Sequence, residues 1–272
     1  MMWLPLGDKK KMRELFAKHG VDVDQEWSVE QRDKKRASDE EQMQKAFQAQ
    51  KAAVYYRYSL WSGDKSLTFD FGEWKPELQK DSKQARLIGT KAYQLSCQMI
   101  NGKDEKDRNF NVLMNGHPGV GKTSLALAML DMQQTYHRSV MVVSTAELAN
   151  LYKMQYDKPD LKMQIDDILR AMKEVDFLLL DDFGTEGGLR SRINQSDYKG
   201  VRSDMQEGIY TVVNARFDEE SRHVLGNVVI TTNNPDSELS RMYDPKIISR
   251  LIPQNPEYRL SFNNMEDVRM KG

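Results

Sequence analysis

Hydrophobic and polar positions change their pattern along the chain. Between residues 109 and 262, short apolar runs alternate with segments in which apolar residues recur at helical spacing. The apolar runs predict five strands, at residues 112–114, 140–143, 177–180, 228–230 and 258–262. The intervening periodic segments predict helices, at residues 124–132, 146–156 and 161–173. Strands without polar residues that alternate with helices are typical of an α/β fold, with a mostly parallel sheet covered on both faces.

Upstream of this alternation the chain has less apolar surface. Pro76 opens a predicted helix that continues until Asn101-Gly102, and residues 67–74 alternate like an extended segment. Ser38 and Glu41 have the spacing of a capping box, so we expect a helix to begin at Ser38. Its apolar stripe includes Phe47. A second short helix is predicted before Gly20, where Met12, Leu15 and Phe16 have helical spacing, and two short helices bury too little to be stable alone. The stripe therefore packs either on the rest of this chain or on another protein.

Composition narrows the class of protein. The chain has 272 residues, of which 30% are charged and 39% hydrophobic, and its formal net charge is −1. No overall basic field attracts nucleic acid, so any contact with DNA must come from a local patch. The single cysteine, Cys97, excludes a disulfide framework and a cysteine-built zinc site. The N-terminus has no apolar run long enough for a signal peptide or a membrane span, so we expect a cytoplasmic protein.

The strongest chemical motif lies between the first predicted strand and the next helix. It reads Gly116-His117-Pro118-Gly119-Val120-Gly121-Lys122-Thr123, with Ser124 after it. The glycines let backbone amides approach phosphate oxygens, and the start of the helix supplies further donors. Lys122 can reach the β- and γ-phosphates, and Thr123 can ligate Mg²⁺ through its hydroxyl. The motif predicts an ATP site that uses Mg²⁺.

Two later strands end in polar residues that would complete this site. The third strand ends in Asp181 and Asp182, and we expect Asp181 to hold Mg²⁺ and Asp182 to orient the attacking water. A glutamate is usual at the second position, so with the shorter Asp182 either the backbone compensates or hydrolysis is slow. The fourth strand ends in Thr232 and Asn233. We expect Asn233, or else Thr232, to contact the γ-phosphate or the water.

A further motif, at residues 244–251, contains Arg250. One interpretation is a solvated arginine on a surface helix. The other is an arginine that reaches the γ-phosphate in a neighbouring subunit and stabilises the charge that develops there. Sequence spacing leaves both open.

With these motifs in place, the chain resembles the DnaC/DnaI/IstB group of AAA+ proteins from about Thr68 to the C-terminus. The motifs that carry the resemblance are Leu178-Leu179-Leu180-Asp181-Asp182-Phe183-Gly184-Thr185-Glu186, Val213-Asn214-Ala215-Arg216-Phe217, Ile230-Thr231-Thr232-Asn233 and Ile248-Ser249-Arg250-Leu251. The resemblance implies an AAA+ P-loop ATPase, with Arg250 as an arginine finger and self-association through the ATP site. Family members often have a second arginine four residues earlier, where this chain has Lys246, so Lys246 receives no catalytic role.

The resemblance also implies a domain division. We expect residues 1–65 to form a small helical region that binds a partner and residues 66–272 to form the ATPase domain. About ten residues follow the last predicted strand, so we expect a core without a C-terminal helical lid. The DnaI type carries an N-terminal zinc module, which the single cysteine excludes here.

Three functions remain as hypotheses. The first, implied by the resemblance, is an ATP-dependent loader that binds a hexameric replicative helicase through its N-terminal helices and places it on single-stranded DNA. The second is an IstB-type transposition helper that remodels duplex DNA. The third is a P-loop kinase for a small molecule, which would need a lid with substrate-facing arginines and an acceptor pocket, and the sequence contains no sign of either.

Candidate DNA contacts fall in two places. The loop at residues 187–203 is either a solvated loop or a segment that contacts phosphates. By resemblance, the helix after the second strand lies where this group places an insertion associated with single-stranded DNA, with a stacking ring beside a charge. The candidates are Tyr152, Lys153, Arg190, Arg192, Lys199 and Arg202.

Overall fold

The computed structural model describes residue 18 and residues 28–63, 66–187 and 201–269. Internal contacts divide the chain into two units, Met1–Phe47 and Gln48–Gly272. Helix α2 (Val29–Arg57) begins in the first unit and ends in the second. None of the described helices is long and apolar enough to cross a membrane.

The start of α2 differs from the prediction. Ser28 and Gln31 form the capping box: the Gln31 amide donates to Ser28 Oγ, and the Ser28 amide donates to Gln31 Oε1. The predicted start at Ser38 is therefore wrong. The charged residues before Ser38 are good helix formers, and ion pairs one turn apart join Glu30 to Lys34 and Lys35 to Asp39.

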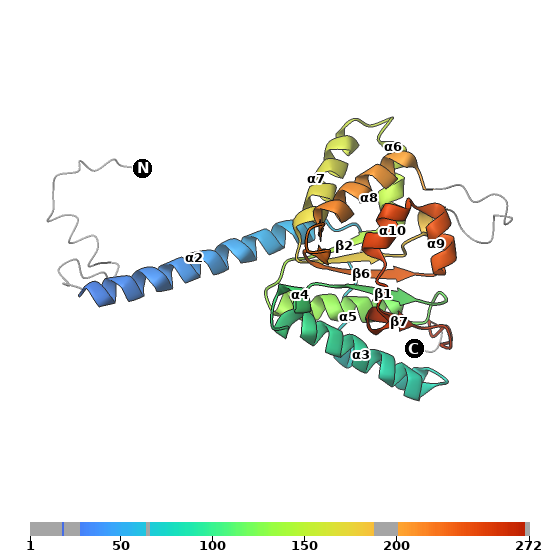
Figure 1. Ribbon diagram of the computed structural model, residues 1–272, viewed down its shortest axis with the longest axis horizontal. Coiled ribbons are helices and arrows are strands. Elements are labelled where there is room, and N and C mark those ends of the chain that lie inside the picture. The colour runs from blue at the N-terminus through green and yellow to red at the C-terminus, as the bar shows by residue number, and fades with distance from the viewer. Residues whose placement is uncertain (1–17, 19–27, 64–65, 188–200, 270–272) are drawn as a thin grey trace. The chain divides into compact units, whose positions relative to one another are not determined.

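A five-stranded parallel sheet organises the second unit (Figure 1). Its order is β2 (Val140–Ser144), β3 (Phe177–Asp181), β6 (Asn227–Thr232), β1 (Asn111–Asn115) and β7 (Arg259–Ser261). All four neighbouring pairs are parallel. The five predicted strands and the α/β class are confirmed, and β6 lies between β1 and β3, which brings the ends of the three strands with site motifs together.

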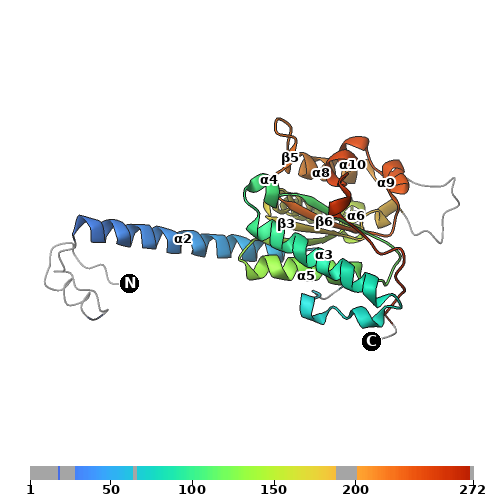
Figure 2. The ribbon, with the colours of Figure 1, turned by 60° about the horizontal axis from the view of Figure 1, so that its bottom comes forward.

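Helices cover both faces of the sheet (Figures 1 and 2). One face carries α3 (Ser82–Asn101) and α5 (Lys122–Thr135), and the other carries α6 (Thr145–Met154), α7 (Asp160–Glu174), α8 (Ser203–Ala215), α9 (Asp236–Met242) and α10 (Pro245–Leu251). Successive strand residues point to opposite faces, so Leu178 and Leu180 of β3 join one core while Phe177 and Leu179 join the other. The second unit also contains the short helix α4 (Glu105–Arg108) and the hairpin β4 (Phe217–Asp218) with β5 (His223–Val224).

Residues ahead of the sheet differ from the prediction in detail. The segment 67–74, expected to be extended, contains a 3₁₀ turn at Phe71–Glu73 that the Asp70 side chain caps. Pro76 begins another 3₁₀ turn (Pro76–Leu78), and α3 starts later, after its N-cap Asp81. At the first turn and at α3, the aspartate before the element accepts hydrogen bonds from neighbouring backbone amides and sets where the element begins.

The end of α2 and the residues after it belong to the second unit. Tyr55 is buried, and Leu60 pairs with the edge strand β2, where its amide donates to Val142 O (2.8 Å) and its carbonyl accepts from the Ser144 amide (2.8 Å). Contacts therefore separate the units at residue 47, whereas we expected a boundary at residue 65. A partner-binding role for residues 1–65 stays a prediction.

Candidate nucleotide-binding site

The predicted phosphate loop joins β1 to α5. Gly116, Gly119 and Gly121 have φ angles of 154°, 78° and 96°, which L side chains rarely adopt. Helix α5 begins at Lys122, and the amides of its first turn have no acceptor within the helix. A helix end of this kind binds anions, because aligned N–H groups point toward the ligand. His117 and Pro118 form the exposed tip of the loop, Val120 is buried beneath it, and Ser124 is half-buried in the helix.

The loop also needs glycine because other chain segments pack against it. A Cβ at Gly121 would lie 2.8 Å from Cζ3 of Trp74, and a Cβ at Gly116 would lie 2.7 Å from the Cβ of Phe262. Real Cβ atoms do not come this close to their neighbours. The backbone cradle that the sequence predicted is therefore present and fits a chain of phosphates.

Lys122 lies folded into the loop. Its side chain is 5% exposed, and Nζ donates to Gly116 O (2.9 Å), His117 O (2.8 Å) and Asn233 Oδ1 (2.7 Å). Burial lowers the pKa of Lys122 to about 8, against the opposing effect of Asp182 and Asp181. The ammonium group thus links the loop to the end of β6, where a γ-phosphate would lie between them.

Asp181 and Thr123 face each other across the gap between β3 and α5. Asp181 Oδ1 accepts hydrogen bonds from Thr123 Oγ1 (2.8 Å) and Thr231 Oγ1 (2.6 Å). Carboxylate and hydroxyl oxygens are the ligands that Mg²⁺ prefers, with waters and phosphates completing its shell. The pair predicted for the metal is brought together.

Asp182 follows on the other side of the strand end. Its backbone adopts a left-handed φ of 55°, and its amide donates to Thr231 Oγ1 (2.9 Å). Burial raises the pKa of Asp182, the negative charge of Asp181 raises it further, and Lys122 and Arg269 oppose both. The unusual backbone is fixed by a neighbouring strand, so the carboxylate is positioned by the fold.

Contacts at the end of β6 distinguish the two candidates for the γ-phosphate contact, Thr232 and Asn233. Thr232 is fully buried, and its hydroxyl donates to Phe183 O (2.6 Å), so it holds the backbone after Asp182. Asn233 instead contacts Lys122. Of the two, Asn233 is the side chain that lies at the phosphate end of the site.

Sequence reasoning missed a buried pair behind these carboxylates. Thr145 Oγ1 donates to Glu186 Oε2 (2.8 Å) and lies 3.1 Å from Asp182 O, while the Gly184 amide donates to the same Glu186 oxygen (3.0 Å). Burial raises the pKa of Glu186 to about 7. The signal was present, since Glu186 ends the third-strand motif, but its contact with Thr145 depends on the pairing of β2 with β3.

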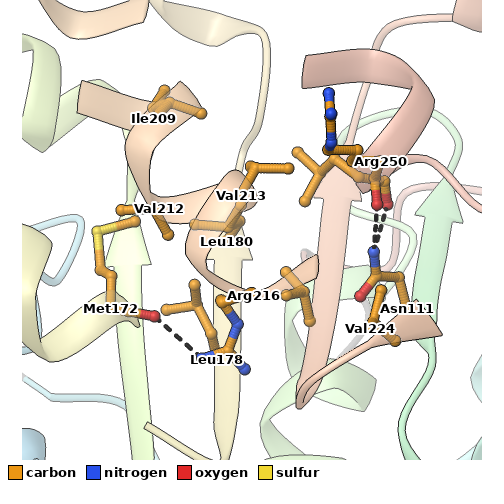
Figure 3. A pocket seen from close by; sticks show the side chains of 12 residues that line it. Asn111, Met172, Leu178, Leu180, Ile209, Val212, Val213, Arg216, Val224 and Arg250 are labelled. Carbon is orange, nitrogen blue, oxygen red and sulfur yellow. Dashed lines mark hydrogen bonds between the residues drawn. The ribbon is translucent and has the colours of Figure 1, made fainter. Parts of the chain in front are cut away.

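Arg250 lies far from this site in its own chain. Asn111, the first residue of β1, donates from Nδ2 to Arg250 O and Leu251 O (3.0 Å each), as Figure 3 shows. The phosphate loop follows the last residue of β1, so the strand length, roughly 13 Å, separates the two. The Arg250 side chain is 17% exposed, pairs with Glu219 (2.8 Å) and lies over the ring of Phe217. The cavity beside it is about 10 Å³, room for about one water and none for a nucleotide.

The DNA-contact candidates are scattered. The ring of Tyr152 is 5% exposed and packs in the core, so it has no free face for a base and its burial argues against the stacking role we expected. Lys153 is exposed. The guanidinium of Arg202 makes a two-pronged ion pair with Asp204 (3.1 and 2.8 Å), which offsets its charge. Arg190, Arg192 and Lys199 lie outside the described residues.

Solved structures with a similar fold include replication proteins. DnaI is 17% identical over 66% of this chain and 85% of its own, with a TM-score of 0.46. The DnaC helicase loader is 18% identical over 76% and 98%, with a TM-score of 0.42. DnaA bound to AMPPCP and single-stranded DNA is 15% identical over 65% and 44%, with a TM-score of 0.43, so this chain spans less than half of it. At this level of similarity these neighbours say nothing about the partners of this chain.

Sequence comparison places the chain in a family. No curated protein matches the sequence. The family model described as IstB-like ATP binding protein matches residues 89–251, more than half of the chain, and this match spans the phosphate loop, the carboxylates after β3, the end of β6 and Arg250. The predictions of an ATP-binding protein and of the ATPase class agree with it. The chain belongs to the family of IstB-like ATP binding proteins.

Proposed function

We propose that the protein is an ATP-dependent loader, which binds a hexameric replicative helicase and helps to place it on single-stranded DNA. The observation that carries the proposal is the separation of Arg250 from the ATP site of its own chain. One chain supplies the phosphate loop, the carboxylates and Asn233, while Arg250 sits at the opposite end of β1. An arginine in that place cannot reach the ATP site of its own chain. We propose that it serves the site of a neighbouring copy, so that ATP would control assembly.

Each side chain of the site has a role in this proposal. Thr123 and Asp181 hold Mg²⁺, which would neutralise charge on the phosphates. Lys122 binds the β- and γ-phosphates, and Asn233 orients the γ-phosphate. Asp182 positions the attacking water, while Thr232 and Thr231 hold the backbone and carboxylates around it. Arg250 of a neighbour stabilises the charge that develops on the transferred group.

The first unit supports a docking role. The described residues from Val29 to Phe47 form a helical segment without a buried residue, and Met43 and Phe47 are 74% and 66% exposed. A helix without a core of its own gains its stability from a partner, because apolar side chains are then removed from water. A ring-shaped helicase is the partner we propose for it.

A second candidate is supported by the family itself. IstB-like ATP binding protein is the description that matches, so a transposition helper that coats and bends duplex DNA fits the same ATP site. The two candidates differ in partner. A loader binds a helicase and single strands, and a transposition helper binds duplex DNA and a transposase.

Affinity capture with purified replicative helicase tests the proposal. We expect the full chain to retain the helicase, and a variant without residues 1–47 to lose it while still binding ATP. Lys122→Ala and Arg250→Ala should keep helicase binding but lose its dependence on ATP. Failure of the full chain to bind any hexameric helicase, with duplex DNA bound instead, would support the transposition candidate.

A further inference from the structure

Glu186 has a buried carboxyl group to which the mechanism proposed above gives no role. It lies in the segment that leaves β3 in a tight turn, residues 182–186, which we call the β3 turn. Burial raises the pKa of Glu186 to about 7, and within the described part of the chain its buried Oε1 has no hydrogen-bond partner. A buried carboxyl group with one unpaired oxygen costs stability. Features that cost stability in this way are typical of functional sites.

The other carboxyl oxygen of Glu186 closes the β3 turn. Glu186 Oε2 accepts hydrogen bonds from the Thr145 hydroxyl (2.8 Å) and from the Gly184 amide (3.0 Å). The Thr145 hydroxyl also lies 3.1 Å from Asp182 O, which accepts from the Thr185 amide (3.0 Å). Thr145 is the first residue of α6. One acceptor oxygen therefore joins the turn that begins at Asp182 to a helix on the far side of β3 from β6.

The β3 turn holds Asp182 in a conformation that needs support. Its φ of 55° is left-handed, and such backbone is unfavourable for residues other than glycine and persists where the surroundings fix it. From the side of β6, Thr231 Oγ1 accepts from the Asp182 amide (2.9 Å). From the side of β2, the contact is made by Thr145 and Glu186. The residue that follows the Mg²⁺ ligand is thus held from both neighbouring strands.

We propose that Glu186 is a positioning residue for ATP hydrolysis, which acts through Thr145 to keep the carboxylate of Asp182 directed at the attacking water. The inference rests on the role proposed above for Asp182. The direction of a side chain follows the φ of its residue, so a looser β3 turn would let this carboxylate move away. A displacement of about 1 Å at a reacting group can lower a rate about 100-fold. Lys122 bonds to the phosphate loop and to Asn233, so ATP binding should not depend on the turn.

Steady-state hydrolysis and titration calorimetry of the full chain with Mg²⁺ and ATP test this role, because a positioning residue changes kcat and leaves the Kd unchanged. Glu186→Met removes both acceptor oxygens at similar side-chain length, and we expect it to lower kcat about 10- to 100-fold. Glu186→Gln keeps one acceptor for the Thr145 hydroxyl and the Gly184 amide, so it should restore kcat to within about fivefold of wild type. Glu207→Met, at an exposed glutamate of α8, is the matched control.

Variants of Thr145 examine the link between Glu186 and the turn. Thr145→Val removes the hydroxyl and should lower kcat as much as Glu186→Met does, whereas Thr145→Ser keeps the hydroxyl and should recover most of the rate. Because the two side chains act as one unit, Thr145→Val combined with Glu186→Met should be no slower than the slower single variant. Thr211→Val is the matched control, since it removes a hydroxyl that donates to Gly208 O (2.8 Å) within α8.

Three results would overturn the inference. The first is a Glu186→Met variant with the kcat of wild type and Glu207→Met. The second is a parallel loss of ATP binding and kcat, which indicates a disturbed site and not a misplaced carboxylate. The third is a double variant in which the two effects multiply, because Glu186 would then not act through Thr145. Where thermal unfolding shows that Glu186→Met does not fold, the comparison of Thr145→Val with Thr145→Ser decides.

The ATP site itself is tested apart from Glu186. Loss of ATP binding in Lys122→Ala supports that site in each of the three cases above, and normal binding by Lys122→Ala would contradict it. Tight ATP binding by a wild type that does not hydrolyse ATP would contradict the hydrolytic role of Asp182 and, with it, the role of Glu186.

Discussion

Lys122 shows at the scale of a single residue how the site is built. Its ammonium group is buried in an anion-binding loop, and hydrogen bonds to three oxygen acceptors compensate in part for its lost hydration. The same residue carries a lowered pKa because burial disfavours its charged form. A bound phosphate would place negative charge beside the ammonium group, so nucleotide and protonated lysine favour each other.

The lowered pKa of Lys122 makes the stability of the fold depend on pH. The folded pKa of Lys122, about 8, lies below its ordinary value of 10.5, so between these values the unfolded chain binds more protons. Its contribution to stability therefore rises with pH across that window. We expect the Tm of the nucleotide-free wild type to rise relative to that of Lys122→Met between pH 7 and pH 9.5. Lys162→Met, at an exposed lysine, should run parallel to wild type. Parallel curves for both variants would contradict the prediction.

Asp182 carries the second prediction at this scale. We propose that Asp182, besides positioning the attacking water, accepts a proton from it. An amide cannot do so, and Asp182→Asn should therefore lower kcat for ATP hydrolysis by about 100- to 10,000-fold. Its backbone contact with Thr231 does not involve the carboxylate, so folding and the Kd for ATP should stay close to wild type. Steady-state hydrolysis and calorimetry measure the two. The control is Asp131→Asn on the exposed side of α5, and equal kcat in both variants would remove Asp182 from the mechanism.

At the scale of elements, one buried arginine joins a helix to the sheet. Arg216, 4% exposed, donates from Nη1 to Met172 O (3.0 Å) and Val175 O (2.6 Å) and from Nη2 to Asn227 O (3.1 Å). It therefore satisfies carbonyls at the end of α7 and the start of β6, and Figure 3 shows it pointing between these elements. The motif that contains Arg216 is one of those that carry the family resemblance. The structural role of Arg216 is to hold α7 against the sheet.

Removing the Arg216 side chain should lower the stability of the fold and leave the ATP site intact. Arg216→Ala leaves several buried carbonyls without a donor, so the free energy of unfolding should fall by about 3 kcal/mol. Urea unfolding measures the change, with Arg86→Ala as the exposed control. A folded Arg216→Ala variant should retain its Kd for ATP, because Arg216 lies at the opposite end of the strands from the phosphate loop. A loss below 0.5 kcal/mol, roughly the size of a surface change, would contradict this role.

At the scale of the whole molecule, our proposal divides the ATP site between two copies of the chain. Arg250 pairs with Glu219 in its own chain and lies a strand length from the loop that it would serve. Heterologous contacts, in which one surface meets a different surface of the next copy, generate rings or filaments. ATP at such a contact links occupancy to assembly.

Mixing two inactive variants tests that division. Lys122→Ala lacks a working phosphate loop but keeps Arg250, and Arg250→Ala has the opposite defect. We expect each alone to hydrolyse ATP at least about 1,000-fold more slowly than wild type, and a mixture to recover part of the activity. A mixture that stays inactive, although both variants fold and associate, would remove Arg250 from the neighbouring site.

The sequence determined the sheet, because each strand is a short apolar run with a helix after it, and local pattern suffices for such elements. It also placed the phosphate loop, Asp181, Asp182 and the pair Thr232–Asn233 at one edge of the sheet, because these residues follow directly on predicted strands and parallel strands end at one edge. The start of α2 was missed because charged residues carry no apolar period, although side-chain pairs stabilise the helix.

Only the tertiary structure decided the rest. The choice of Asn233 over Thr232 depends on which side chain meets Lys122, and the pair Thr145–Glu186 depends on the pairing of two strands. The burial of Tyr152, the position of Arg250 relative to the phosphate loop and the hydrogen bond of Val268 to Gly119 all depend on residues far apart along the chain. The sequence pattern reflects interactions between residues that are close along the chain, and these predict individual strands and helices. The contacts above form only after the sheet has brought distant segments together.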